Sequence, residues 1–251
     1  MTTLILARHE WRRLLVQSWT WGLLAATVAL LAYLFLLQVD AFLGGQSRLA
    51  ATPDAPGVTD LVAVPLLRMV GNLQLFLVPL LTMRAVAGER RDHSLALLLS
   101  SGVDDGAIVL GKWLGVMGWN LALIALATLM PLSLLTATPV DLGRVAAAVL
   151  GLMAQAALLS AVGIYLSTLT RQPPLAAALG VAANLGLNLV DAGARLNGLN
   201  HGLINWIALP SHLDPLMRGL VSAVDLAYFA IGAAACLALA AGRVGSLRSA
   251  D

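Results

Sequence analysis

The residues best suited to chemistry in this sequence form a charge cluster between two long apolar runs. The cluster comprises Arg84, Glu89, Arg90, Arg91, Asp92, His93 and Ser94. A leucine-rich turn with Leu97 and Leu98 follows, and polar residues continue to about residue 107 before the next apolar run. The segment 84–107 is therefore long enough for a helix lying across the base of a membrane domain, where it could dock a soluble partner. Charged residues steer such docking, and leucines fill a pocket at its centre.

No catalytic or metal-binding pattern accompanies the cluster. The four histidines have no spacing of the HExxH type, and Cys236 is the only cysteine. Lys112 follows Gly111, but the nucleotide-binding pattern GxxxxGK[ST] is missing, as is the GxSxG elbow of hydrolases. We expect a protein that is not itself an enzyme and that holds no cofactor or metal of its own.

The composition excludes a soluble domain. The chain is 59% hydrophobic and 11% charged, whereas soluble domains carry about 25% charged residues. The net charge of +2 is too small to indicate nucleic-acid binding. Runs of about 20 apolar residues span a bilayer as helices, so we predict an all-α, polytopic membrane protein forming a single domain over residues 1–251. The six predicted spans are Trp19–Val39, Leu61–Val86, Ile108–Leu129, Val145–Leu169, Leu175–Val190 and Val224–Ala241.

The distribution of basic residues predicts the orientation. With a cytoplasmic N-terminus, only Arg48, Arg144, Arg195 and Arg218 lie outside, and Arg68 lies within a span. The positive-inside rule then places both termini in the cytoplasm. Residues 1–18 place Trp11 and Leu14 on one helical face and His9, Arg12 and Arg13 on the other, which favours a helix in the headgroup plane over a plain charged tail.

Polar residues also occur inside the predicted spans and in the segments that are predicted to connect them on the outer side. The outer segment 191–223 is long and partly apolar, which suggests short helices dipping back toward the membrane, the alternative being a surface loop. Buried amides most simply hold a bundle together, whereas a charge such as Arg68 faces protein or water. We expect Arg68 to pair with Asp225. The residues expected to line a pathway or to hold the structure are Arg68, Asn72, Arg218, Asp225 and Tyr228.

Together these features resemble the permease subunit of a type-2 ABC exporter. The resemblance rests on 76–84 (FLVPLLTMR), Glu89, 94–100 (SLALLLS), 109–115 (VLGKWLG) and 218–229. Within that superfamily the chain looks most like the gliding-motility-associated permeases and the permease of the nitrous-oxide-reductase maturation exporter.

The resemblance implies a half-transporter of the bacterial inner membrane. Two permeases, identical or homologous, would form the pathway, and a dimer of separate ATPase subunits would hold ATP and Mg²⁺. Residues 1–18 would form an elbow helix, and 84–107 would supply the coupling helix that seats in the ATPase. The ATPase-coupling residues would be the charge cluster from Arg84 to Ser94, with Leu97 and Leu98.

Three alternatives remain open on sequence alone. A haem-export or cytochrome-maturation permease would use Trp206, His201 or His212 on the outer side. An ion-driven secondary transporter usually needs carboxylates at mid-membrane, whereas Asp225 lies near a span end. A passive membrane scaffold would have no ATP-dependent partner.

Overall fold

Long helices account for almost all of the residues that the structure describes. The computed structural model describes residues 2–49, 56–92, 102–196 and 206–248, and these ranges contain helices and no strand. Six of the helices are long and apolar enough to cross a membrane. They are α2 (Ser18–Leu49), α3 (Val64–Thr82, preceded by a π-helical turn at Thr59–Ala63), α6 (Asp105–Leu132), α7 (Leu142–Leu169), α8 (Pro173–Leu196) and α11 (Ala223–Arg248). The predicted all-α polytopic architecture is confirmed.

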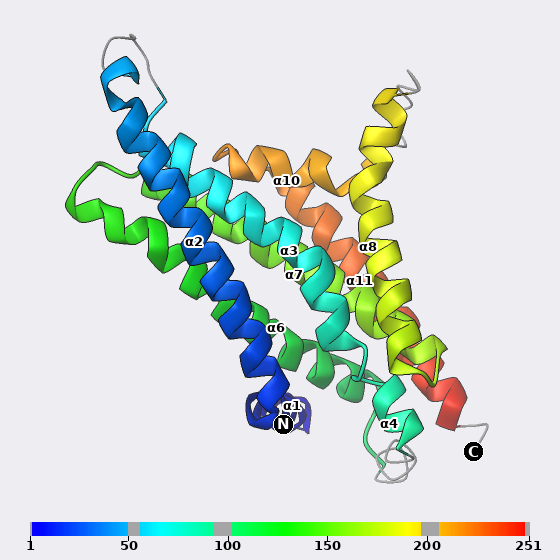
Figure 1. Cartoon of the computed structure of the whole chain (residues 1–251). Helices are drawn as coiled ribbons and strands as arrows, with labels where there is room; N and C mark the ends of the chain where they lie inside the picture. The colour runs from blue at the N-terminus through cyan, green and yellow to red at the C-terminus, as the bar shows by residue number, and fades with distance from the viewer. Residues whose placement is uncertain (1, 50–55, 93–101, 197–205, 249–251) are drawn as a thin grey trace.

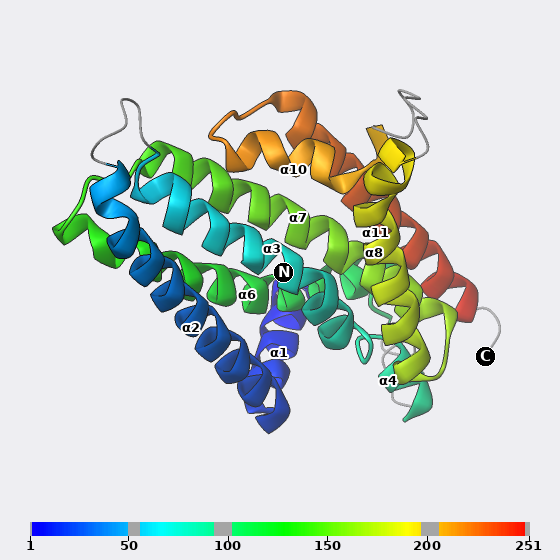
Figure 2. The ribbon, with the colours of Figure 1, turned by 45° about the horizontal axis from the view of Figure 1, so that its top comes forward.

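Two of these helices form the centre of the bundle. In the most apolar window of α3 and of α7, 61% of the residues are buried, against 11% in α2 and 22% in α8 and α11. Leu66 and Leu67 of α3 and Leu152 and Leu159 of α7 are fully buried in one hydrophobic core. Figures 1 and 2 both show α3 lying between α2 and α8. The peripheral helices therefore leave apolar faces for lipid or for another membrane protein.

Three short helices lie at the two ends of the bundle. Helix α1 (Thr2–Val16) crosses beneath the start of α2, and α4 (Ala87–Arg91) lies at the same end (Figure 1). Helix α10 (Leu209–Met217) lies at the opposite end. It falls in the outer segment 191–223, for which short helices were predicted, and residues 197–205 of that segment are outside the described ranges.

Two glycines of α6 allow α1 to approach closely. A Cβ atom added at Gly115 would lie 2.7 Å from the Cβ of Glu10, and one added at Gly118 would lie 2.9 Å from the Trp11 ring. Helix α1 accordingly packs mainly on α6 rather than on α2, its neighbour in sequence. Gly115 and Gly118, which lie three residues apart on α6, thus form a seat for the N-terminal helix.

Candidate functional site

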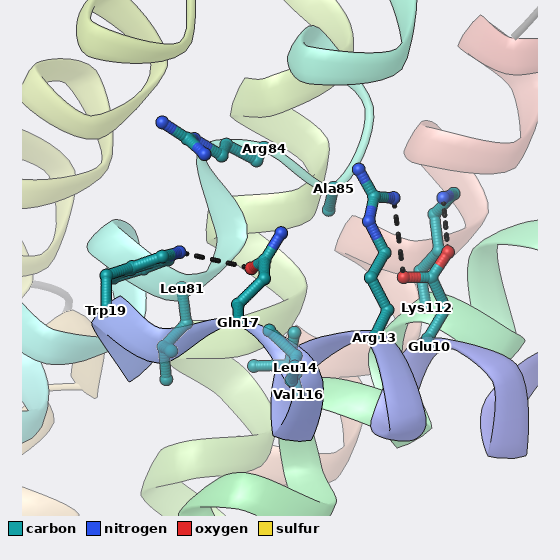
Figure 3. A pocket seen from close by; sticks show the side chains of 10 residues that line it. All are labelled: Glu10, Arg13, Leu14, Gln17, Trp19, Leu81, Arg84, Ala85, Lys112 and Val116. Atoms are coloured by element: carbon teal, nitrogen blue, oxygen red, sulfur yellow. Dashed lines mark hydrogen bonds and ion pairs between the residues drawn. The ribbon is translucent and has the colours of Figure 1, made fainter. Parts of the chain in front are cut away.

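A buried ion cluster joins three elements at the end of the bundle that carries α1. The Nζ atom of Lys112, on α6, lies 2.8 Å from Glu10 Oε1 on α1 and 2.5 Å from Glu89 Oε1 on α4. Arg13 Nη1, also on α1, lies 3.0 Å from the same Glu89 oxygen. Figure 3 shows Glu10, Arg13 and Lys112 pointing toward one another. We call these four residues the elbow cluster.

The elbow cluster balances its charges around a lysine that is almost out of contact with water, while the Arg13 side chain is 33% exposed. Two cations face two carboxylates, and the Lys112 side chain is only 2% exposed. Transfer of each ion from water is costly, so the arrangement holds only while its partners are present. Loss of one partner would leave a buried carboxylate or ammonium uncompensated, which costs about 3–5 kcal/mol. The cluster therefore fixes α1 and α4 relative to the α6 span.

Helix α4 is also held by the end of α7. The hydroxyl of Ser167 accepts hydrogen bonds from the backbone N–H groups of Val86 (3.2 Å) and Ala87 (3.0 Å), which are free at the start of α4. Arg90 Nη1 donates to the Thr168 carbonyl at 2.8 Å. The short helix is thus fastened to α6 on one side and to α7 on the other, so movement of α4 is mechanically linked to two spans.

The residues predicted to couple to an ATPase occupy different environments. Arg84, Arg91 and Asp92 are exposed, and Arg90 is half-buried. Glu89 is only 8% exposed, and its carboxylate is directed into the elbow cluster rather than outward. His93, Ser94, Leu97 and Leu98 lie outside the described residues. An exposed docking face can therefore be drawn only from Arg84, Arg91 and Asp92.

The remainder of the predicted coupling segment leads into α6. Asp104 caps that helix by accepting a hydrogen bond from the Ala107 N–H at 3.2 Å. Asp105 Oδ1 lies 3.0 Å from Arg248 Nη2 at the end of α11. Asp104 and Asp105, near the end of the predicted coupling segment, are thus attached to α6, and Asp105 also pairs with α11.

At the other end, the expected pair of Arg68 and Asp225 is wrong. Arg68 Nη1 lies 2.5 Å from Asp214 Oδ1, and Asp225 Oδ1 lies 2.8 Å from His212 Nδ1. Helix α10 carries both Asp214 and His212. It therefore pairs with Arg68 of α3 through Asp214 and with Asp225 of α11 through His212. Helix α10 packs on α7, α8 and α11. Arg68 and Asp225 therefore each pair with a residue of α10 instead of with each other.

His212 is the centre of a compact aromatic group. Its Nε2 atom lies 3.0 Å from the Trp206 carbonyl, so both ring nitrogens have a hydrogen-bond partner. The Tyr228 ring stacks on it at 4.1 Å, and the Tyr228 hydroxyl donates to the Ile207 carbonyl at 2.7 Å. His212 is thus engaged on both nitrogens and is not free to bind a haem iron. His201 is outside the described residues.

A polar stripe runs along the outward face of α3. Arg68 and Asn72 are exposed and lie one helical turn apart, with exposed Phe76 one turn further. By insertion scales, a charge facing lipid costs about 2.5–3.5 kcal/mol, so such a face is suited to water or to another protein. Arg218, which follows α10, is exposed as well.

Two of the buried amides join helices of the bundle. Asn120 instead donates to the Val116 carbonyl of its own helix, and the Gln74 side chain has no hydrogen-bond partner among the described residues. Gln155 Nε2 donates to the Gly71 carbonyl at 2.8 Å, which joins α7 to α3. Asn184 Nδ2 donates to the Leu75 carbonyl at 3.2 Å, which joins α8 to α3. These two hydrogen bonds attach α7 and α8 to α3.

Comparison with known proteins identifies the family. The family described as ABC-2 family transporter protein matches residues 4–193, which run from α1 through most of α8 and cover more than half of the chain. A search among curated proteins gives no match. The matched region contains the elbow cluster, α4 and the polar stripe of α3. This multi-pass chain therefore belongs to the ABC-2 transporter family, as a membrane permease component that is not itself catalytic.

Proposed function

We propose that this permease works as half of an ATP-driven exporter in the bacterial inner membrane. Two permeases form the pathway, and two separate ATPase subunits bind beneath the end that carries α1 and α4, which faces the cytoplasm. The resemblance to gliding-motility and nitrous-oxide-reductase maturation permeases supports export as the direction. The observation that carries the proposal is the elbow cluster, because it connects the base of the protein to a span.

The elbow cluster and Ser167 give α4 the attachment that a coupling element needs. Docking energy acts on the spans only if the docked segment is rigidly connected to them. Glu89 connects α4 to α6 through Lys112, and Ser167 connects α4 to α7. Arg91 and Asp92 remain exposed at the end of α4, where they can form charge pairs with an ATPase.

The polar stripe of α3 supports a second permease as partner. Arg68 and Asn72 face outward from a helix whose other sides are buried. A second permease placed against the α3 face would shield these groups from lipid and could enclose a polar route between the two chains. Helices α2 and α8, which flank α3, are the least buried spans together with α11 and would share that interface (Figure 2).

The docking assignment is tested by reversing one exposed charge. The permease is purified in mild detergent, and the co-purifying ATPase is identified and quantified by mass spectrometry. Arg91→Glu should reduce the recovered ATPase about tenfold, since a close charge pair at an interface contributes about 1.5 kcal/mol or more. Arg171→Glu is the matched control, because Arg171 is exposed in the turn between α7 and α8 at the same end of the bundle.

The outcomes separate the two parts of the proposal. Unchanged ATPase recovery with Arg91→Glu would remove α4 as the docking element. Absence of any ATPase from the wild-type preparation would contradict the whole assignment. Glu89 is unsuitable for this test, because its replacement would break the elbow cluster from within.

A further inference from the structure

A polar cavity opens beside the elbow cluster, where four elements meet. Its volume is about 300 Å³, and it lies between α1, the end of α3, α4 and the start of α8. The residues that define its chemistry are Arg13, Gln17, Arg84, Arg91, Asp92 and Pro173. Three arginines and one acid give the lining an excess of positive charge, which favours an anionic ligand.

The cavity lies at the depth of lipid headgroups. Helix α2 begins at Ser18, α3 ends at Thr82 and α8 begins at Pro173, so three apolar helices start or stop at this level. Trp19, in the first turn of α2, adds the type of side chain that is enriched at membrane interfaces. The ligand best placed to enter the cavity is therefore a component of the adjacent leaflet.

Two of the three arginines are free to bind that ligand. Arg13 is engaged by Glu89, but neither Arg84 nor Arg91 forms an ion pair or a hydrogen bond within the described part of the chain. The Arg84 guanidinium lies 5.9 Å from the centre of the Trp19 ring, which positions the group without using its N–H donors. Guanidinium groups bind phosphate oxygens in a bidentate manner.

An apolar crevice continues from the polar cavity. It shares Arg13, Gln17 and Arg84 with the cavity and has a volume of only about 20 Å³. Its other lining residues are Leu14, Leu81, Ala85, Val116, Trp19, and Glu10 and Lys112 of the elbow cluster. Figure 3 shows Leu14 and Val116 close together, with Gln17 between them and Arg84. The crevice is too small for an acyl chain, so the choice of a lipid over a free phosphate rests on the position of the cavity among the helix ends.

We infer that this cavity is a binding site for the phosphodiester headgroup of an anionic phospholipid. The phosphate lies between Arg84 and Arg91, which both line the cavity, and the acyl chains remain in the surrounding leaflet. The bound lipid connects α1, α3, α4 and α8, and so stabilises α4 in the position set by the elbow cluster. This site goes beyond the proposed coupling function, because it needs the membrane and no ATPase.

Native mass spectrometry of the permease alone tests the site. The probes are phosphatidylglycerol, phosphatidylcholine of the same chains, and glycerol phosphate as the water-soluble headgroup. Wild-type protein should bind phosphatidylglycerol at least about tenfold more tightly than phosphatidylcholine. The double variant Arg84→Gln/Arg91→Gln should bind it about 30-fold more weakly, because each arginine near an anionic surface contributes a factor of about five.

Two further variants distinguish the site from general charge effects. Arg12→Gln/Arg171→Gln removes the same charge from exposed positions outside the cavity and should retain wild-type affinity for phosphatidylglycerol. Arg84→Lys/Arg91→Lys keeps the charge and should lose less than the glutamine variant, which excludes misfolding as the cause.

Three results would overturn the inference. They are equal affinity of the wild type for the two lipids, equal loss in the two glutamine variants, and binding of glycerol phosphate as tight as that of the lipid. ATPase recovery is measured separately in phosphatidylcholine. Because Arg91 is also the proposed ATPase-docking residue, loss of the ATPase there tests the docking proposal alone. Unchanged affinity of the double variant Arg84→Gln/Arg91→Gln for phosphatidylglycerol would also overturn the lipid site.

Discussion

The elbow cluster makes a quantitative prediction about Lys112→Met. Methionine preserves much of the side-chain length but removes the ammonium group that lies 2.8 Å from Glu10 and 2.5 Å from Glu89. Arg13 then remains as the single cation of the cluster, at 3.0 Å from Glu89 and 3.8 Å from Glu10. Because the buried carboxylates lose their closest partner, the cost is about 3–5 kcal/mol. At 25 °C this favours undocking of α1 by about two to nearly four orders of magnitude.

Hydrogen exchange followed by mass spectrometry measures this local opening. The amides of α1 in Lys112→Met should exchange faster by about two orders of magnitude or more, whereas those of the central helix α7 should keep wild-type protection. Arg12→Met is the matched control, because Arg12 lies on the same helix, is exposed and has no ion-pair partner among the described residues. Its exchange should equal that of the wild type.

A triple variant separates charge imbalance from lost packing. In Lys112→Met/Glu10→Gln/Glu89→Gln no carboxylate remains in the cluster, and Arg13, whose side chain is 33% exposed, keeps its charge in contact with solvent. Replacement of buried ionic groups by neutral residues is often nearly neutral. Protection of α1 should therefore recover most of the way to wild type. The reasoning would be refuted if Lys112→Met left α1 exchange unchanged, or if the triple variant opened α1 as far as the single variant.

Three other perturbations address α4, the seat of α1 and the face of α3. Ser167→Ala removes the acceptor at the start of α4 and should lower stability by about 1 kcal/mol, measured as thermal unfolding in detergent, while reducing ATPase stimulation by the permease. Gly115→Ala places a methyl group within 2.7 Å of an α1 side chain and should increase protease cleavage of α1, whereas Gly22→Ala, with nothing within 4 Å, should not. Asn72→Cys in a Cys236→Ser background should give a cross-linked permease dimer in membranes.

Each of these predictions has a result that contradicts it. For α4, the contradictory result is full ATPase stimulation by Ser167→Ala. For the seat, it is equal protection of α1 in the two glycine variants. For α3, it is a cross-linked dimer formed as readily from Leu121→Cys, on the exposed side of α6, as from Asn72→Cys.

The fold could be predicted because bilayer thickness leaves so few solutions. Each apolar run of about 20 residues becomes one helix, and all six predicted spans appear. Their ends were less predictable. Helix α2 continues to Leu49, well past the predicted end at Val39, and α8 runs to Leu196 instead of Val190. Polar residues can extend a helix into the aqueous layer, and hydropathy does not report that extension.

The site was only partly predictable, because its contacts join distant parts of the chain. The charge cluster around Glu89 indicated the right region, but Glu10 and Lys112 are 102 residues apart, and no periodic pattern relates them. One available signal was a lysine placed inside an apolar helix, since such a charge requires a partner. The Arg68 error had a similar origin: α10 supplies Asp214, and hydropathy alone gives no reason to place α10 there.

The separation of Glu10 from Lys112 also imposes an order on biogenesis. The ribosome must make the intervening 102 residues before the elbow helix has its seat, which takes about 5–20 s at about 5–20 residues per second. During that interval the nascent N-terminus waits with Glu10 and Arg13 solvated, and it can dock only after α6 has been inserted. Docking of the first helix is thus a late checkpoint, which reports that the third span has entered the membrane.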